Sequence, residues 1–598
     1  MSEDHIGVSG LGAISTGERP GGHHGPQSWV GDWSARRASL TPDRVGLVDA
    51  TTGREFTYAE LDRRATRTAR WLDDFGVRAT GGDATGSGDD TEGGAGGRVA
   101  VVSRNRPELV DLFFATGKTG GVLAPLSHRL APPELAELLS NVDPELVVVE
   151  EPFAEDVTAA FDREEWTGDC PVRSLAVDGE HTWSSVGAGV ADHSSVGAEI
   201  AEGSSVETGA EENASYDGPD IAPGDPHLFL HTGGSTGVPK ETVLSHEALV
   251  WNSLNTITAW GLRPDDVTPL TFPTFHTGGW NVITIPLFHM GGEVVIAREF
   301  DPGQVLSVVE NRGATVLVAV PAVLRMMTEH DRWGETDLST LRFAKSGGGP
   351  CREAVMDAWW DRDVDLSQGY GLTECGPNNF AMPEDWSREK ADTVGVPNPH
   401  VDARVVDGDG HECATGEIGE LELRSPHAAD RYWHEPEETA ATFGATAPSG
   451  DPEGSGSDTS GSVSTGDRVS TAGWVSTGDL ARVDEDGYVS IEGRKKNMYV
   501  SGGENVYPAE VEDAVADHPS VAEVVVVPVP DERWGQVGKA VVQPVGTDAE
   551  LTVEELSTFL DDRLARFKHP KHLAFVDEMP TSGPSKIDRE AVASEFGE

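Results

Sequence analysis

Strand-like and helix-like segments alternate through the first 150 residues, and this alternation restricts the fold more than any other feature of the sequence. The runs "VAVVS" (99–103) and "LVVVE" (146–150) are apolar and have the length of buried strands. Thr57 and Glu60 have the spacing of a capping box, and apolar residues at helical intervals follow them between positions 61 and 72. Parallel strands covered by helices on both faces produce this pattern, so we expect an α/β fold.

The chain is too long for a single hydrophobic core. It has 598 residues, whereas single cores stop growing beyond roughly 250–300 residues. The segment "EGRKKNMYV" (492–500) precedes about a hundred residues with the pattern of a separate βαβ-like unit, which is an ordinary domain size. We therefore predict a large N-terminal domain of layered sheets and helices over residues 28–495, and a small mobile C-terminal α/β domain over residues 497–598.

Three stretches interrupt the α/β pattern, near residues 79–97, 176–222 and 445–472. They are rich in Gly, Ser, Asp and Thr, and they contain too little apolar surface to offset the entropy lost on ordering. Periodic α/β sequence resumes on both sides of each stretch. We therefore interpret them as mobile surface insertions and not as domain boundaries.

The chain is strongly acidic. It has 102 Asp and Glu residues against 45 Lys and Arg, a formal net charge of −57. Such a charge repels nucleic acids and anionic membrane surfaces, so we expect neither as a partner. Because the acidic residues are spread along the chain, they favour a halophilic surface adapted to high salt over a binding site for one basic partner.

Cysteine spacing and the N-terminal segment both favour an intracellular protein. The four cysteines show no CxxC spacing, so neither a disulfide framework nor a zinc site is indicated. The N-terminus lacks the basic flank and apolar core of a signal peptide, and no apolar run has membrane-spanning length. We expect a cytoplasmic protein without integral membrane contact, and the sequence leaves open whether it is a monomer or a homodimer.

A glycine-rich loop, "HTGGSTGVPK" (His231–Lys240), follows an apolar run. It does not match the Walker pattern, because Val238 and Pro239 separate Gly237 from Lys240. Its glycines nonetheless let backbone N–H groups approach an anion, its hydroxyls can donate hydrogen bonds, and its lysine supplies positive charge. Taken alone, such a loop is equally typical of a polar turn after a buried strand.

Four more motifs follow this loop in a fixed order. They are "QGYGLTECGP" (368–377), "GWVSTGDL" (473–480), "EGRKKNMYVSGGENVYPAEVE" (492–512) and "SGPSKIDR" (582–589). The set of five resembles the adenylate-forming, or AMP-binding, superfamily of acyl- and aryl-CoA synthetases, peptide-synthetase adenylation domains and beetle luciferases. The resemblance covers roughly residues 28–590 apart from the insertions.

The resemblance implies that a carboxylic acid is activated with ATP and Mg²⁺ to acyl-AMP and pyrophosphate, and then transferred to a thiol, usually that of coenzyme A. The first step brings two anions together, so the protein must supply positive charge and orientation. Lys586 matches the lysine that bridges the carboxylate and the α-phosphate, although Ser585 stands where the family usually has Gly. Lys496 matches the hinge about which the C-terminal domain rotates between the two half-reactions.

The same resemblance implies roles for the other motif residues. Thr236 is placed nearest the β- and γ-phosphates, and it shares the magnesium site with Glu374, whose hard carboxylate suits that cation. Asp479 is placed on the ribose hydroxyls, and Tyr370 either against adenine or as a core aromatic residue. The catalytic set is Lys586, Thr236, Glu374 and His276. The ATP- and AMP-binding set is Thr232, Gly233, Gly234, Ser235, Thr236, Gly237, Lys240, Gly347, Gly348, Gly349, Tyr370, Gly371, Thr373, Glu374, Asp479, Arg494 and Lys586.

The segment Thr271–Gly292 matches the part of the family that lines the acyl pocket. It contains no acidic residue, which disfavours an amino-acid substrate because a buried ammonium group needs a carboxylate partner. Its apolar side chains suit a fatty or aromatic acid, with His276 either at the pocket or as a core histidine, and Trp280 either a pocket wall or packing. The implied pocket residues are Phe275, His276, Gly279 and Trp280, and the implied coenzyme A channel residues are Gly502, Gly503 and Glu504.

The chain ends shortly after the predicted catalytic lysine, so we expect free coenzyme A as the acceptor instead of a carrier protein. The first hypothesis is therefore an acid–thiol ligase, an ATP-dependent acyl-CoA synthetase for a fatty or aromatic acid. The second is a specialised enzyme such as succinylbenzoate–CoA ligase, which needs a cationic or amide-rich pocket. The third is a catalytically silent AMP- or ATP-binding module, motivated by Ser585 and by Glu241, which would repel ATP if it pointed inward.

Overall fold

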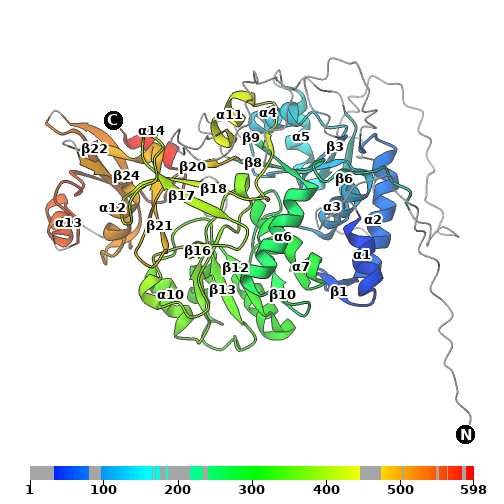
Figure 1. The fold of residues 1–598 in the computed structure, drawn as a ribbon, viewed down its shortest axis with the longest axis horizontal. Coiled ribbons are helices and arrows are strands. Elements are labelled where there is room, and N and C mark those ends of the chain that lie inside the picture. The colour runs from blue at the N-terminus through cyan, green and yellow to red at the C-terminus, as the bar shows by residue number, and fades with distance from the viewer. Residues whose placement is uncertain are drawn as a thin grey trace, which may run out of the picture.

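The structure is a computed structural model of the whole chain. It describes residues 32–79, 96–163, 166, 168, 170–175, 184–185, 216–232, 240–444, 473–501, 504–531, 533–546, 551–561, 563–581 and 587–597. Figure 1 shows a large part built from the N-terminal three quarters of the chain and a small part, coloured orange to red, built from its C-terminal end. Within the described ranges, no helix is both long and apolar enough to cross a membrane.

The largest sheet has eight strands in the order β19-β9-β8-β4-β3-β5-β6-β7. The central neighbours β8, β4, β3, β5 and β6 run parallel, whereas β7, β9 and β19 join the sheet by antiparallel pairing. The strands predicted at 99–103 and 146–150 are confirmed as β3 and β5. The bounds are β3 (Arg98–Val102), β4 (Val122–Leu126), β5 (Leu146–Glu150), β6 (Val172–Leu175), β7 (Ser184–Ser185), β8 (Pro226–Thr232), β9 (Lys240–Ser245) and β19 (Arg431–Tyr432).

Helices between these strands follow the predicted pattern. The capping box is present, because the Thr57 hydroxyl accepts from the Glu60 N–H while the Glu60 carboxylate accepts from the Thr57 N–H at 2.8 Å. The predicted apolar stripe of the following helix, positions 61, 65, 69 and 72, is fully buried. The helices of this part are α1 (Trp33–Leu40), α2 (Tyr58–Asp73), α3 (Pro107–Thr119), α4 (Pro132–Val142), α5 (Ala154–Phe161) and α6 (His246–Trp260).

Strand β7 lies inside one of the three stretches predicted to be insertions, residues 176–222. It pairs with the edge strand β6, so this part of the stretch extends the sheet. A two-residue strand carries no alternating apolar pattern, and the sequence therefore gives no signal for it. Most of the three stretches lies outside the described residues, and for those residues the insertions stay a prediction.

Two smaller sheets accompany the eight-stranded sheet in the large part. One has the order β10-β11-β1-β2, and the other is an all-parallel sheet of β12, β13 and β14. The loop after β13 contains the predicted residues Gly347, Gly348 and Gly349, and the loop after β14 contains the motif of residues 368–377. Both therefore lie at the carboxyl ends of parallel strands, where open α/β sheets bind ligands. The bounds are β1 (Val45–Asp49), β2 (Arg54–Thr57), β10 (Val267–Pro269), β11 (Glu293–Ile296), β12 (Val316–Ala319), β13 (Phe343–Ser346) and β14 (Leu366–Gln368), with helices α7 (Thr284–Met290), α8 (Pro302–Val308), α9 (Pro321–Glu329), α10 (Glu353–Trp360) and α11 (Pro436–Phe443).

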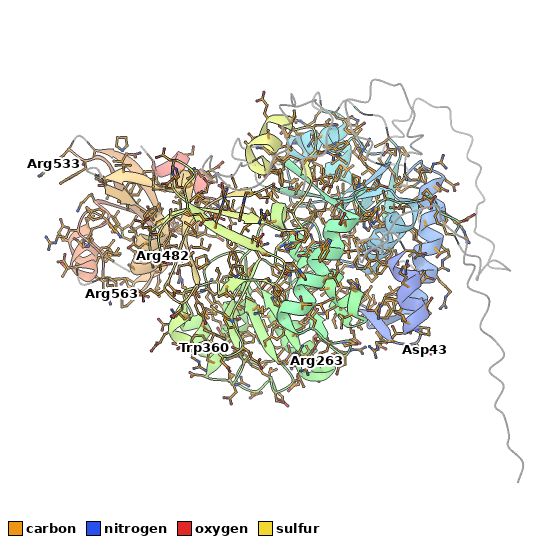
Figure 2. The ribbon with its side chains drawn as sticks, viewed as in Figure 1. Asp43, Arg263, Trp360, Arg482, Arg533 and Arg563 are labelled. Atoms are coloured by element: carbon orange, nitrogen blue, oxygen red, sulfur yellow. The ribbon has the colours of Figure 1, made fainter. Side chains whose placement is uncertain are left out.

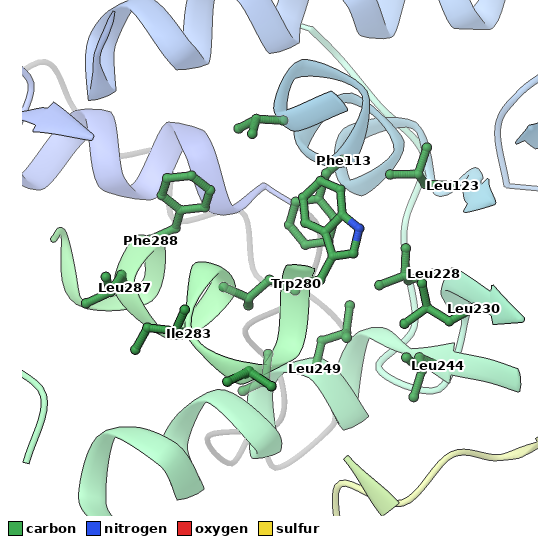
Figure 3. Packing of buried hydrophobic residues seen from close by; sticks show 14 of the residues in the cluster. Phe113, Leu123, Leu228, Leu230, Leu244, Leu249, Trp280, Ile283, Leu287 and Phe288 are labelled. Atoms are coloured by element: carbon green, nitrogen blue, oxygen red, sulfur yellow. The ribbon is translucent and has the colours of Figure 1, made fainter. Parts of the chain in front are cut away.

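Trp280 occupies the centre of the main hydrophobic core (Figure 3). Its ring is fully buried and stacks on Phe113, with 5.1 Å between the ring centroids. Its indole N–H donates to the Thr274 carbonyl at 2.6 Å, so the polar atom of this buried ring is satisfied. These contacts support the packing alternative for Trp280.

The small part has its own core and a five-stranded sheet in which β25 pairs with β22, β24 and β26. Strands β25 and β26 are parallel and helix α13 lies between them in sequence, so one βαβ unit is present. Figure 2 places Arg533 and Arg563 in this part and Asp43 at the far end of the large part. The bounds are β22 (Tyr499–Ser501), β23 (Glu504–Val506), β24 (Val521–Asp531), β25 (Gly535–Pro544), β26 (His572–Phe575), α12 (Pro508–Ala516), α13 (Val553–Leu560) and α14 (Arg589–Phe596).

An antiparallel sheet of β17, β18, β20 and β21 lies between the small part and the rest of the large part (Figure 1). Its last strand leads through the short 3₁₀ turn η7 (Lys495–Asn497) into the small part. The bounds are β17 (Asp402–Val406), β18 (Gly419–Arg424), β20 (Val475–Val483) and β21 (Val489–Arg494), and a separate two-stranded pair consists of β15 (Phe380–Ala381) and β16 (Val396–Pro397).

Candidate active site

The ends of the glycine-rich loop are fixed by a β-hairpin. Thr232 ends β8 and Lys240 begins β9, and the two residues are direct cross-strand partners. The loop between them, residues 233–239, lies outside the described residues and includes the predicted positions Gly233, Gly234, Ser235, Thr236 and Gly237. The sheet therefore holds both ends of the predicted phosphate loop at one place.

Lys240 makes an ion pair with a glutamate. Its Nζ lies 2.7 Å from Oε2 of Glu438 on α11, and 5.7 Å from the centre of the Tyr432 ring. The lysine side chain is buried, and its charge is therefore compensated by a carboxylate. A phosphate at Lys240 would compete with Glu438 for this ammonium group, which has three N–H donors.

Glu241 lies on the opposite face of β9 from Lys240, because successive side chains of a strand point to opposite faces. Its cross-strand partner on β8 is His231, so these two side chains share a face with Phe229 and Val243. Glu241 is fully buried, and neither carboxylate oxygen has a hydrogen-bond partner within the described part of the chain. This burial raises the pKa of Glu241 to about 8.

Tyr370, Asp479 and Arg494 come from three separate motifs and are in direct contact. The Tyr370 hydroxyl donates to Oδ2 of Asp479 at 2.5 Å, and Nε of Arg494 lies 2.8 Å from Oδ1 of the same carboxylate. Asp479 and Arg494 are cross-strand partners on β20 and β21, so backbone pairing sets their separation. Burial, and next the Asp479 charge, raise the pKa of the Tyr370 hydroxyl.

This constellation suits a sugar or base with adjacent hydroxyl groups. Asp479 is an acceptor-only group whose two oxygens are oriented by a hydroxyl on one side and a guanidinium on the other. The Arg494 side chain is half exposed, and its Nη1 also donates to the Thr477 carbonyl at 3.2 Å. The carboxylate is thus held rigidly by side chains from two other motifs.

Glu374 is held by a tyrosine that the sequence analysis did not identify. The Tyr432 hydroxyl, from β19, donates to Oε1 of Glu374 at 2.8 Å. Glu374 is mostly buried and belongs to the 3₁₀ turn η5 (Thr373–Cys375) of the motif. Tyr432 lies far from every motif in sequence, and no spacing pattern predicts this contact, which depends on β19 pairing with β9.

Replacing Tyr432 with phenylalanine removes one hydroxyl and leaves the ring in place. Partners that orient metal-binding carboxylates typically change metal affinity by 10–100-fold, so we expect Y432F to weaken Mg²⁺-dependent ATP binding by about tenfold. Titration calorimetry with Mg²⁺ and ATP measures the change. The matched control is Y488F, because Tyr488 is a tyrosine of the large part whose described contact is with the Lys390 ammonium; unchanged binding in Y432F would contradict the role given to the hydroxyl.

Glycine occurs for different structural reasons in the two loops at the carboxyl ends of β13 and β14. A Cβ atom at Gly347 or Gly349 would meet no atom within 4 Å, so these positions adjoin open space. A Cβ at Gly371 would lie 1.9 Å from the Pro377 carbonyl oxygen, so only glycine allows the motif to fold back on itself. The first loop therefore leaves space beside its glycines, and the second is fixed by a close backbone approach.

The candidate acyl segment divides into an exposed and a buried part. His276 is exposed, which is inconsistent with the alternative of a core histidine. Phe275 is buried beside it, with ring centroids 4.8 Å apart, and the His231 ring lies 6.0 Å from Phe275 and 6.1 Å from His276. A Cβ at Gly279 would lie 2.4 Å from the Pro273 carbonyl oxygen, so this glycine allows the segment to turn tightly.

At the predicted hinge, two exposed neighbouring lysines form ion pairs with glutamates in different parts of the molecule. Lys495 is 2.6 Å from Glu420 of β18 in the large part, whereas Lys496 is 2.9 Å from Glu590 of α14 in the small part. Glu504 begins β23 and pairs with Ser501, the last residue of β22. The predicted residues Gly502, Gly503 and Lys586 lie outside the described residues.

Charged contacts also join the two parts away from the hinge. Nη2 of Arg352 lies 3.1 Å from Glu523, and Nη1 of Arg352 donates to the Ala522 carbonyl at 3.0 Å. Arg325 approaches the same carboxylate at 3.4 Å. Two arginines of the large part therefore converge on one edge of β24.

Comparison with known proteins agrees with this architecture. The model of the AMP-binding enzyme family matches residues 34–433, and that of the AMP-binding enzyme C-terminal domain matches residues 510–586. The feruloyl-CoA synthase of an Amycolatopsis species is 32% identical over 570 residues, covering 95% of this chain and 99% of that protein. The indoleacetate–CoA ligase of Aromatoleum aromaticum is 32% identical over 565 residues, covering 94% of this chain and 97% of that protein.

A solved structure shares the fold over the same length. The crystal structure of ATP-bound MatB from Rhodopseudomonas palustris superposes with a TM-score of 0.76 and 28% identity, covering 95% of this chain and 99% of that one. The mixed α/β fold of a large N-terminal AMP-binding domain and a small C-terminal domain is thus common to both. The chain therefore belongs to the AMP-binding enzyme family and is an AMP-forming acid–CoA ligase of the acyl-CoA synthetase superfamily.

Proposed function

We propose that the protein activates an aromatic carboxylic acid with ATP, releasing pyrophosphate and forming acyl-AMP, and then transfers the acyl group to coenzyme A. The observation that carries this proposal is the contact between Tyr370, Asp479 and Arg494, which come from three motifs and present one carboxylate for a ribose. The likeness to ATP-bound MatB supports ATP as the nucleotide.

We propose a role for each residue of the site. Lys240 and the loop before it would hold the β- and γ-phosphates, in competition with Glu438. Glu374 would hold Mg²⁺ with Thr236, since a carboxylate oriented by a tyrosine hydroxyl is a suitable ligand for a hard cation. The bound Mg²⁺ would neutralise phosphate charge. Lys586 would neutralise the charge that develops as the carboxylate attacks the α-phosphate.

The second half-reaction needs the nucleotide site to open toward a thiol. The turn Lys495–Asn497 joins two parts that each have their own hydrophobic core, which suits rotation about Lys496. We propose residues 28–495 and 497–598 as the two domains, with Gly502, Gly503 and Glu504 along the coenzyme A channel. Domain movement of this kind separates two chemical steps in many enzymes.

The comparisons and the pocket segment favour an aromatic acid. The relatives at 32% identity are named for feruloyl and indoleacetate substrates, and one at 31% identity is named for a fatty acid. In this chain, Thr271–Gly292 carries no acidic residue, and an exposed His276 beside a buried Phe275 offers a polar group next to an apolar surface. An alkyl chain would meet the same apolar surface, so a fatty acid is the second candidate.

Pyrophosphate release with a panel of acids tests the proposal. The purified protein would be assayed at molar KCl, as its net charge of −57 suggests, with ATP, Mg²⁺ and ferulate, indole-3-acetate, benzoate, decanoate or 2-succinylbenzoate. We expect release with at least one aromatic acid, and an acyl-CoA product once coenzyme A is added. Preference for 2-succinylbenzoate would favour the specialised ligase, and tight ATP binding without release from any acid would favour the silent module.

A further inference from the structure

The candidate acyl segment contains an irregular turn. Residues Gly278–Val282 form a π-helical turn, η3, and Ile283 breaks the regular backbone before α7 begins. In a π-helical turn the Val282 carbonyl would accept from the N–H five residues later, but that N–H, of Leu287, donates to the Ile283 carbonyl instead. Pro286, four residues later, has no N–H to offer. The sequence therefore leaves a buried carbonyl that needs a donor from elsewhere in the fold.

The side-chain amide of Asn378 supplies that donor. Its Nδ2 donates to the Val282 carbonyl at 2.9 Å and lies 3.5 Å from the Asn281 carbonyl. A second amide, Asn252 of α6, donates to the Asn281 carbonyl at 2.6 Å. Asn252, Asn281 and Asn378 are all almost fully buried. Two neighbouring carbonyls of the turn are thus satisfied by side chains and not by the helix itself.

The backbone of Asn378 is fixed to the nucleotide motif. Asn378 directly follows the motif of residues 368–377, and the next N–H, of Asn379, donates to the Tyr370 carbonyl at 3.0 Å. The Asn378 carbonyl accepts from the side chains of Asn255 at 2.7 Å and Asn398 at 2.8 Å. The residue is therefore held firmly from the motif side, and its amide reaches across to the turn.

The turn also orients the residues before it. Nδ2 of Asn281 donates to the Thr277 hydroxyl at 3.1 Å, and Thr277 directly follows His276. A shift of η3 would therefore move the exposed histidine and the buried Phe275 relative to Tyr370 and Glu374. Errors of about 1 Å in the relative placement of reacting groups can lower rates by about 100-fold.

We propose that Asn378 is a positioning residue that locks the acyl segment to the nucleotide motif and thereby sets the affinity for the carboxylic acid. The proposal rests on the proposed function, in that the segment carrying His276 receives the acid. The Asn378 amide donates to the Val282 carbonyl of the turn, and the Asn252 amide donates to the neighbouring Asn281 carbonyl.

The variant N378D tests the donor directly, because aspartate keeps the size of asparagine and replaces the amide with an acceptor. The matched control is N398D, which removes another buried amide donor that bonds to the Asn378 carbonyl and does not contact the turn. With ferulate and indole-3-acetate as probe acids, N378D should raise KM for the acid at least tenfold while KM for ATP changes by less than about twofold. Equal rises in both KM values, or the same pattern in N398D, would overturn the proposal.

Amide hydrogen exchange gives a second readout that does not depend on catalysis. The Leu287 N–H bonds to the Ile283 carbonyl directly after the turn. We expect exchange across residues 281–290 to be at least about tenfold faster in N378D and unchanged in N398D. If the unmodified protein releases no pyrophosphate with any acid, the proposed function fails, while unchanged exchange in N378D would refute the lock itself.

Discussion

Replacing Lys586 with alanine is expected to lower acyl-adenylate formation by about 10²–10³-fold, the usual loss when one preorganised donor to a developing charge is removed. Thioester formation from supplied acyl-AMP and coenzyme A should remain nearly unchanged, because that step no longer joins a carboxylate to a phosphate. Pyrophosphate release measures the first step, and acyl-CoA formation from synthetic acyl-AMP measures the second.

The control for this variant is K571A, which removes an exposed lysine of the same domain that lies outside the proposed machinery. K571A should retain both half-reactions. An equal loss of both half-reactions in K586A would show that Lys586 has a different role. Full activity of K586A in adenylation would place the essential cation elsewhere, and Lys240 would then be the first residue to test, because it already binds a carboxylate.

The second large effect concerns the pH dependence of stability. Glu241 has a pKa of about 8 in the folded protein against a normal value of 4.5, so between these values the folded state holds a proton that the unfolded state has lost. Its contribution to stability is complete below pH 4.5 and is lost as the pH rises toward 8. The loss is about 1.4 kcal/mol per pH unit, or roughly 4 kcal/mol between pH 5 and pH 8.

The variant E241Q removes this titration and leaves the shape of the side chain. Its unfolding temperature should match that of the unmodified protein near pH 5 and exceed it increasingly up to pH 8. The comparison is made between the two proteins at each pH because buried histidines with lowered pKa values, such as His227 and His246, titrate in both. The facing His231, with a pKa lowered to about 3, stays neutral throughout this range.

The exposed Glu137 of α4 provides the control. The variant E137Q should follow the unmodified protein at every pH. If E241Q and E137Q behave alike, the Glu241 carboxylate has a partner or solvent that lowers its pKa, and the interpretation of a neutral buried acid is wrong.

Patterns of residues close together in the sequence predicted much of the fold. Capping chemistry gave the start of α2 from Thr57 and Glu60, and apolar runs gave β3 and β5, because these signals depend only on residues close in sequence. Strand β7 carried no such signal, since it exists only where the edge of β6 is free to pair. The resemblance, in turn, named Tyr370, Asp479 and Arg494 before any geometry was known, and the structure brings these three together.

Contacts between distant segments were beyond the reach of the sequence. The Tyr432 hydroxyl reaches Glu374 only because β19 pairs with β9, and nothing near position 432 indicates that pairing. The place of Glu241 was partly accessible, because a residue next to Lys240 on a strand must point to the other face. Pro286 was a local sign that a carbonyl would lack its donor, but only the fold identifies Asn378 as the replacement.

The ion pair between Lys240 and Glu438 has a consequence for how the site receives an anion. The Glu438 carboxylate spares the buried ammonium group the high free-energy cost of a charge without a partner. If a phosphate binds at this lysine as proposed, it competes with that carboxylate for the same ammonium group. The contact should therefore add less net attraction for the nucleotide than a lysine without an ion-pair partner would.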